Sequence, residues 1–185
     1  MRPAIAQPVT APPVRRATHR LDRAECDRIH VSADDRVRPR HQQNTMPCCA
    51  VAELADDLDP SALDAGLLVV QRRHPLLNVF VEDHPQTGLG FRRPACVPPI
   101  PVSVVDAGTG RTWCDVVAAE LTRPFDLSSA PMIRVVLLGS GPTTSAATVL
   151  TVADVIVDGL SAGYVLRSLL RCCGVQPRRL SLFER

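Results

Sequence analysis

The residues best suited to chemistry stand together in one short segment near the carboxyl end of the chain. The segment reads Ala153-Asp154-Val155-Ile156-Val157-Asp158-Gly159 and carries two carboxylates. A carboxylate can accept a proton in a general-base step or hold a loop in place through hydrogen bonds and ion pairs. A glycine permits a tight turn where the backbone must approach another group closely. Asp154, Asp158 and Gly159 are therefore the residues of this segment whose surroundings decide what chemistry is available to it.

A strand and a helix must position this segment. Residues 146–152 form an apolar run with β-branched residues, which predicts a buried strand. Residues 160–171 predict a helix whose apolar side carries Val165, Leu166, Leu169 and Leu170. Gly174 can cap that helix, and Pro177 prevents its continuation. A strand that ends in a glycine-containing turn and leads into a helix commonly presents side chains to a cleft.

The rest of the chain predicts a mixture of strands and helices. A helix begins with Asp59 as N-cap and Pro60 at its first position, and its apolar stripe holds Leu63, Leu67, Leu68 and Val70. A second helix runs to about residue 122 from the capping-box pair Thr112 and Asp115. Strands are predicted at 47–54, 76–81, 89–92, 102–105 and 132–138. This order indicates an α+β fold, a mixed α/β layered sandwich, and not a regular βαβ repeat.

Length and composition indicate one globular domain. The chain has 185 residues, of which 45% are hydrophobic and 22% charged, and its net charge is +2. This charge predicts no special attraction to nucleic acid or to a membrane. No run approaches the roughly 18 apolar residues of a membrane span. Prolines interrupt the first residues, so we expect no secretory signal and a cytoplasmic location.

The cysteines predict neither a disulfide framework nor a zinc site. Their number is odd, two pairs are directly adjacent, and no Cys-x-x-Cys spacing occurs: Cys26, Cys48, Cys49, Cys96, Cys114, Cys172 and Cys173. We expect buried, reduced thiols. No P-loop, dinucleotide-binding glycine pattern or metal-ligand cluster is present in the sequence, so no cofactor is expected.

Several of these residues also have a purely structural interpretation. Asp158 and Gly159 could form a simple turn, and His74 before Pro75 could end a helix instead of acting as a base. Ser161 fits the first turn of a helix better than it fits a nucleophile, because no Gly-x-Ser-x-Gly elbow surrounds it. A charge run with Arg36, Arg38 and Arg40 fits a solvated surface better than a binding patch.

Three segments, in order, resemble the amino-terminal half of condensation domains and of polyketide-associated acyltransferases. The first is Arg73-His-Pro-Leu-Leu-Asn-Val-Phe80, similar to the family's Arg-His-(Glu/Pro)-x-Leu-Arg segment. The second is Arg123-Pro-Phe-Asp-Leu-Ser-Ser-Ala-Pro-Met-Ile-Arg-Val-Val-Leu-Leu138, similar to the Pro-Phe-Asp-Leu … Pro-Leu-x-Arg stretch. The third is Ala153–Gly159, similar to the His-His-x-x-x-Asp-Gly motif. The resemblance covers roughly residues 45–172.

The resemblance implies a single chloramphenicol acetyltransferase-like lobe. Members of this superfamily are about twice as long as this chain and have two lobes, with the active site in a channel between them. This chain resembles the first lobe only. We expect a flexible leader at 1–17, the lobe at 18–174 and a basic tail at 175–185.

The resemblance also makes Asp154, Asp158 and Gly159 the candidate catalytic positions, in a motif that is degenerate in this chain. Ala153 and Asp154 stand where the family has histidines, the second of which is the proposed general base. A carboxylate, with a reference pKa of about 3.9, is a poorer base near neutral pH than an imidazole with a pKa of about 6.5. Asp158 is the motif aspartate, which in the family pairs with an arginine. Asn78 replaces that arginine here, and Arg73 or Arg134 is the expected substitute.

Three functions follow as hypotheses. The first is acyl transfer from a carrier-bound or coenzyme A thioester to an amine or hydroxyl in nonribosomal peptide, polyketide or lipid biosynthesis, impaired in this chain alone by its degenerate site. It implies an acyl or peptidyl carrier protein as partner, and a second lobe on another chain or self-association. The second is a non-catalytic interaction domain that recruits a carrier protein or a tailoring enzyme. The third is a truncated remnant that exposes an apolar face.

Overall fold

The computed structural model describes residues 47–86, 88–106, 108, 110–141 and 145–183. The leader and the basic loop with Arg36, Arg38 and Arg40 lie outside the described residues, as does a short helix that the sequence weakly indicates at residues 21–31. The strands are β1 (Pro47–Glu53), β2 (Phe80–His84), β3 (Gly88–Arg92), β4 (Val102–Val105), β5 (Ile133–Leu138), β6 (Ala147–Ala153) and β7 (Arg179–Phe183). The helices are α2 (Pro60–Arg73), the 3₁₀ turn η1 (Pro75–Asn78), α3 (Trp113–Thr122) and α4 (Gly159–Cys172).

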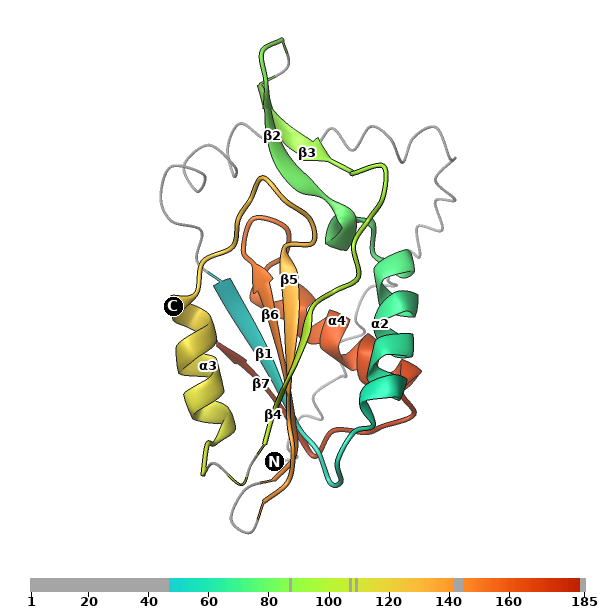
Figure 1. The fold of residues 1–185 in the computed structure, drawn as a ribbon, viewed down its shortest axis with the longest axis vertical. Coiled ribbons are helices and arrows are strands. Elements are labelled where there is room, and N and C mark those ends of the chain that lie inside the picture. Colours follow the sequence, from blue (N-terminus) through green and yellow to red (C-terminus); the bar gives the residue numbers. More distant parts are fainter. Residues whose placement is uncertain (1–46, 87, 107, 109, 142–144, 184–185) are drawn as a thin grey trace, which may run out of the picture.

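A five-stranded sheet in the order β4-β5-β6-β1-β7 forms the centre of the fold (Figure 1). β6 pairs antiparallel with β1 and with β5, and β4 pairs parallel with β5. The register places Ala153, the last residue of β6, opposite Pro47 at the start of β1. The candidate segment therefore leaves the sheet at the end where β1 and β5 begin.

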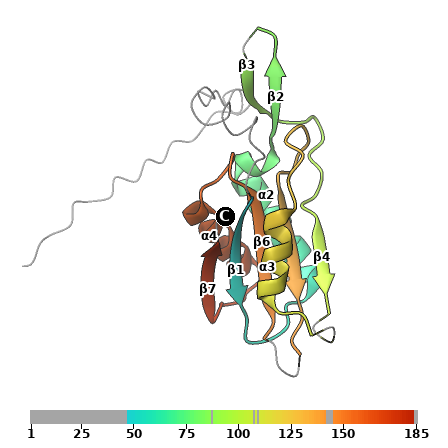
Figure 2. The same ribbon diagram turned by 90° about the vertical axis from the view of Figure 1, so that its left-hand side faces the viewer.

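Helices cover both faces of the sheet. Side chains of a strand alternate between its two faces, so each buried strand contributes to two cores. Cys48, Ala50 and Ala52 of β1 pack with residues of α2 and α4, whereas Cys49 and Val51 pack with residues of α3. Figure 2, viewed from the side of α3, shows α4 behind the sheet. The predicted mixed α/β layered fold is confirmed.

The start and end signals read from the sequence are confirmed for the helices. Asp59 caps α2 by accepting a hydrogen bond from the backbone N–H of Ser61 at 3.1 Å, and Thr112 and Asp115 form a reciprocal capping box for α3. Gly174 follows α4 with φ +72°, a conformation that suits glycine. Leu68 was expected in the buried stripe of α2, but it is 51% exposed, so the apolar face is narrower than predicted.

Two strand predictions need correction. Residues 76–78 belong to η1, because Pro75 starts a 3₁₀ turn in which the N–H of Leu77 donates to the carbonyl of His74. β2 and β3 do form the predicted hairpin, which projects beyond the sheet in Figure 1.

The tail at 175–185 was expected to be unpatterned, yet Arg179–Phe183 forms β7 and pairs antiparallel with β1. Leu180 and Leu182 are the alternating apolar residues that indicate this strand.

The thiols are only partly as expected. Cys48 and Cys49 are buried and reduced, and Cys173 is half-buried, but Cys96, Cys114 and Cys172 are exposed. Cys26 lies outside the described residues. None of the helices in the described part of the chain is both long and apolar enough to cross a bilayer.

Candidate functional site

The candidate segment is a tight turn between β6 and α4. The N–H of Ala153 donates to the carbonyl of Met132 at 3.0 Å, and the carbonyl of Ala153 accepts from the N–H of Ile156 at 3.1 Å. Ile156 is 5% exposed and anchors the turn in the core, while Asp154 between them is half-buried. The turn therefore holds the Asp154 backbone between two fixed points.

Asp158 is the N-cap of α4. Its side-chain Oδ1 accepts a hydrogen bond from the N–H of Ser161 at 2.7 Å, and its carbonyl accepts from the N–H of Ala162 at 2.9 Å. Ser161 thus lies in the first turn of the helix, as the sequence predicted. Gly159 is buried at the first helical position and has no positive φ. An aspartate directly before an apolar helical run is a recognised start signal, so the cap could have been read from the sequence.

Removing the cap is expected to destabilise the domain modestly. Asp158→Ala deletes the acceptor for the Ser161 N–H and should lower the free energy of unfolding by about 1 kcal/mol. Asp158→Asn keeps a capping oxygen without the charge, so its stability should stay close to that of the parent. Urea denaturation of the three proteins measures both effects. An equal loss in Asp158→Asn would show that the charge of Asp158 matters more than its capping bond.

Two other residues of the resemblance, His74 and Asn78, lie at the end of α2 and in η1. Asn78 is 4% exposed, and its Nδ2 donates to the carbonyl of Gln71 at 2.7 Å. It therefore ties η1 to the last turn of α2. His74 is the C-cap of α2, and its backbone N–H donates to the carbonyl of Val70. This confirms the helix-end interpretation of His74.

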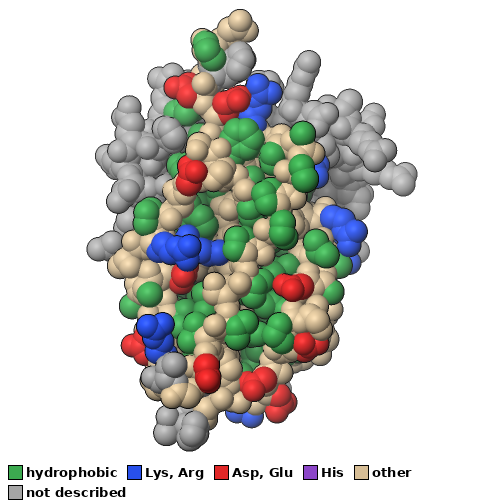
Figure 3. Space-filling view, viewed as in Figure 1, with side chains coloured by type: hydrophobic (Ala, Val, Ile, Leu, Met, Phe, Trp, Pro, Cys, Tyr) green, Lys and Arg blue, Asp and Glu red, His purple; other side chains and the backbone are tan. Residues whose placement is uncertain are grey.

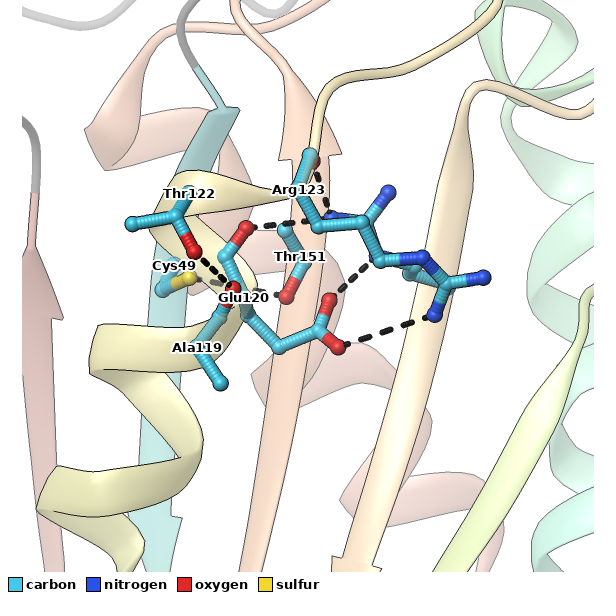
Figure 4. Close-up of polar contacts among 7 residues, drawn as sticks. Cys49, Ala119, Glu120, Thr122, Arg123 and Thr151 are labelled. Carbon is cyan, nitrogen blue, oxygen red and sulfur yellow. Dashed lines mark hydrogen bonds and ion pairs between the residues drawn. The ribbon is translucent and has the colours of Figure 1, made fainter.

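Arg134 does not reach toward α4. It lies on the face of the sheet that α3 covers, whereas α4 packs on the opposite face. Its Nε pairs with Oε2 of Glu120, and its Nη2 donates to the carbonyls of Glu120 at 3.1 Å and Arg123 at 2.6 Å. Figure 4 shows Glu120 and Arg123 in front of the strands that carry Cys49 and Thr151. The expectation that Arg134 substitutes for the arginine partner of Asp158 is wrong, because successive residues of a strand face opposite sides.

Sequence reasoning missed the Arg134–Glu120 pair. The signal was present, because Arg134 interrupts an otherwise apolar strand and charged residues are almost never fully buried without a partner. The partner could not be found from the sequence, since Glu120 lies on a separate helix. The burial of Glu120 is a result of how α3 packs on the sheet.

Acid is expected to weaken the fold through His74. Burial, and then the charge of Arg73, lowers the pKa of His74 below its ordinary value of 6.5. At a pH between the lowered pKa of His74 in the folded chain and its ordinary pKa in the unfolded chain, only the unfolded chain binds the proton. The free energy of unfolding therefore falls as the pH drops from about 7 to about 5. His74→Gln should flatten this part of the curve when urea denaturation is repeated across that range. An unchanged slope in the variant would assign the effect to other groups.

The described residues offer carboxylate chemistry more readily than thiol or metal chemistry. Burial raises the pKa of the Cys49 thiol, although a hydrogen bond with Thr151 opposes the effect, and burial also raises the pKa of Cys173. Both thiols are therefore poor nucleophiles near neutral pH. Within the described ranges no three His, Cys, Asp or Glu side chains group as a metal site would require.

Comparisons with known proteins place the fold. No protein-family model matches the chain. Cyclosporin synthetase simA of Tolypocladium inflatum is 32% identical over 101 residues, which is 55% of this chain and 1% of that protein. Among solved structures, the starter condensation domain of rhizomide synthetase RzmA has a TM-score of 0.57 and 17% identity over 76% of this chain and 36% of that one.

Two further solved structures agree. The first condensation domain of the CDA synthetase has a TM-score of 0.60 and 14% identity over 72% of this chain and 35% of that one. The tallysomycin biosynthesis protein TlmII has a TM-score of 0.56 and 20% identity over 71% of this chain and 33% of that one. The chain therefore has the fold of one lobe of a condensation domain and spans about a third of these structures. The resemblance seen in the sequence is confirmed at the level of the fold.

Proposed function

We propose that this chain is one lobe of a condensation-type acyltransferase and that its own catalytic step is impaired. The observation that carries the proposal is the β6–turn–α4 unit, in which Asp154 follows the strand and Asp158 caps the helix. The condensation-domain fold of the chain supports the proposal, because it agrees with the family that the motif resemblance indicates.

The proposed reaction is transfer of an acyl group from a thioester. An amine or hydroxyl attacks the acyl carbon, a C–N or C–O bond forms, and the C–S bond breaks. The thiol leaves with the proton that the nucleophile loses. A positioned base typically accelerates such a step by about 10²–10⁴-fold. Asp154 at the base position is a weaker proton acceptor than an imidazole, and while ionised its charge opposes a developing oxyanion.

The proposed partners follow from the same reaction. The donor would be a coenzyme A thioester or a phosphopantetheinyl thioester on a carrier protein, and a second lobe, from another chain or a second copy, would close the channel. Figure 3 shows hydrophobic side chains spread over the face that carries β4. Val104 in that edge strand is 64% exposed. An apolar face of this kind is typical of a surface that another domain covers.

The test uses an acyl-pantetheine thioester as donor and an amino-acid amide as acceptor. We expect saturable binding of the donor, measured by calorimetry, with transfer within about tenfold of the reaction without protein, because the base is missing. Transfer about 10³-fold above that background would overturn the proposed impairment. Absence of donor binding, whether the thioester is free or loaded on a carrier protein, would overturn the acyl-transfer assignment.

The exposed β4 face also fits a second candidate, a non-catalytic domain that recruits a carrier protein or tailoring enzyme through this face. Val104→Asp should then abolish capture of a purified carrier protein, whereas Ser103→Asp, on the opposite face of the same strand, should not. Asp154→Asn should leave capture unchanged in this case. Capture that responds to Asp154→Asn and ignores Val104→Asp would favour the acyl-transfer site instead.

A further inference from the structure

Arg134 and Glu120 form a buried ion pair, and removing their two charges from water costs free energy. Their side chains are 9% and 10% exposed, and the Arg134 Nε donates to the Glu120 Oε2. Removing two charges from water often costs as much free energy as their attraction returns, so hydrophobic residues of similar size would stabilise a fold equally well. The other contacts of the pair therefore matter more to its role than the attraction between its two charges.

The remaining donors of Arg134 hold the end of α3 and the segment after it. Its Nη2 donates to the carbonyls of Glu120 and Arg123, and its guanidinium lies over the ring of Phe125, 4.1 Å from the centroid. The last carbonyls of a helix have no partner within the helix and carry the negative end of its dipole, so a cation is stabilised there. One side chain thus fixes where the chain goes after α3.

The segment fixed in this way makes two backbone contacts beyond α3. The carbonyl of Leu127 accepts from the N–H of Val81 at 2.7 Å, at the base of the β2–β3 hairpin. The carbonyl of Met132 accepts from the N–H of Ala153 at 3.0 Å, directly before Asp154. Asp126, directly before Leu127, accepts hydrogen bonds from the backbone N–H of Ser128 and the hydroxyl of Ser129, which tighten the turn between the two contacts.

We infer that Arg134 and Glu120 are a positioning pair that sets the location of Ala153, and so of Asp154, through the segment between α3 and β5. The same pair sets the base of the β2–β3 hairpin. Arg134 acts through backbone contacts on the α3 face and not through Asp158. The inference concerns the turn that the proposed function uses, but its measurement needs neither substrate nor activity.

Amide hydrogen exchange on the full chain tests this inference. Arg134→Lys keeps a positive charge for Glu120 but loses the fork that reaches two carbonyls. We expect the Val81 and Ala153 amides to lose protection by about tenfold, while amides of the β1–β7 ladder keep theirs. Glu120→Gln, which keeps an acceptor for the Arg134 Nε, should weaken the same two amides by a smaller factor. Arg92→Lys, in the exposed pair with Glu82, is the matched control and should change neither amide.

Two results would overturn the inference. One is unchanged protection at Val81 and Ala153 in Arg134→Lys. The other is a uniform loss of protection across the sheet, which is what a merely stabilising ion pair produces. The exchange experiment contains no thioester, so its outcome does not depend on whether the chain binds one. The inference and the proposed function can therefore fail separately.

Discussion

Asp154→His is expected to raise acyl transfer in the thioester assay by about 10²-fold, the lower end of what a positioned base contributes. An imidazole has a pKa of about 6.5 and can take and return a proton near neutral pH, whereas an ionised carboxylate is the weaker base. The substitution is made at a half-buried position of the turn, where the Asp154 Oδ1 is itself enclosed by protein. Initial rates at fixed donor and acceptor concentrations measure the gain.

Two variants control for this result. Asp154→Asn removes the charge without adding a base, so it should stay near the parent rate. Ala153→His adds a ring where the residue is fully buried, and overpacking of this kind costs about 1–3 kcal/mol of stability. If Asp154→His binds the donor as tightly as the parent but transfers no faster, the missing base is not what limits the reaction.

Arg134→Met is expected to lower the free energy of unfolding by about 3–5 kcal/mol. The methionine fills similar space, but the buried Glu120 carboxylate then keeps only Arg123, whose exposed side chain has its Nη1 3.9 Å from the Glu120 Oε1. The carbonyls of Glu120 and Arg123 lose a donor at the same time. Urea denaturation at neutral pH measures the loss.

The double variant Arg134→Met/Glu120→Leu separates an unpaired charge from lost packing. It should recover most of the stability, because a well-packed hydrophobic pair replaces a buried ion pair at little cost. Arg92→Met is the exposed control, since the side chains of Arg92 and Glu82 are 56% and 36% exposed and such pairs contribute about 0–1 kcal/mol. A loss below about 1 kcal/mol in Arg134→Met would contradict the buried-charge argument.

Much of the fold was predictable because its signals are local. Asp59 and Pro60 start α2, and Thr112 with Asp115 starts α3, through contacts within one helical turn. The apolar runs of β5 and β6 indicate strands that are buried on both faces. β7 was missed because five residues with two leucines give a weak alternating pattern, and its stability comes from pairing with β1.

The candidate site was predictable in place but not in its contacts. Motif order located the turn at Ala153–Gly159, yet the cap made by Asp158 was overlooked in favour of a distant arginine. The side on which Arg134 lies depends on strand register, which a single residue shift would reverse. The burial of Glu120 depends on the face of α3 that meets the sheet.

The amino-acid sequence by itself determined the helix caps, most strands, the mixed α/β class and the position of Asp154, because each depends on residues close together in the chain. Only the tertiary structure decided that Arg134 pairs with Glu120, that β7 completes the sheet beside β1 and that Met132 holds Ala153. These contacts join residues far apart in sequence, and their free energy depends on burial and register, which exist only once the layers have packed.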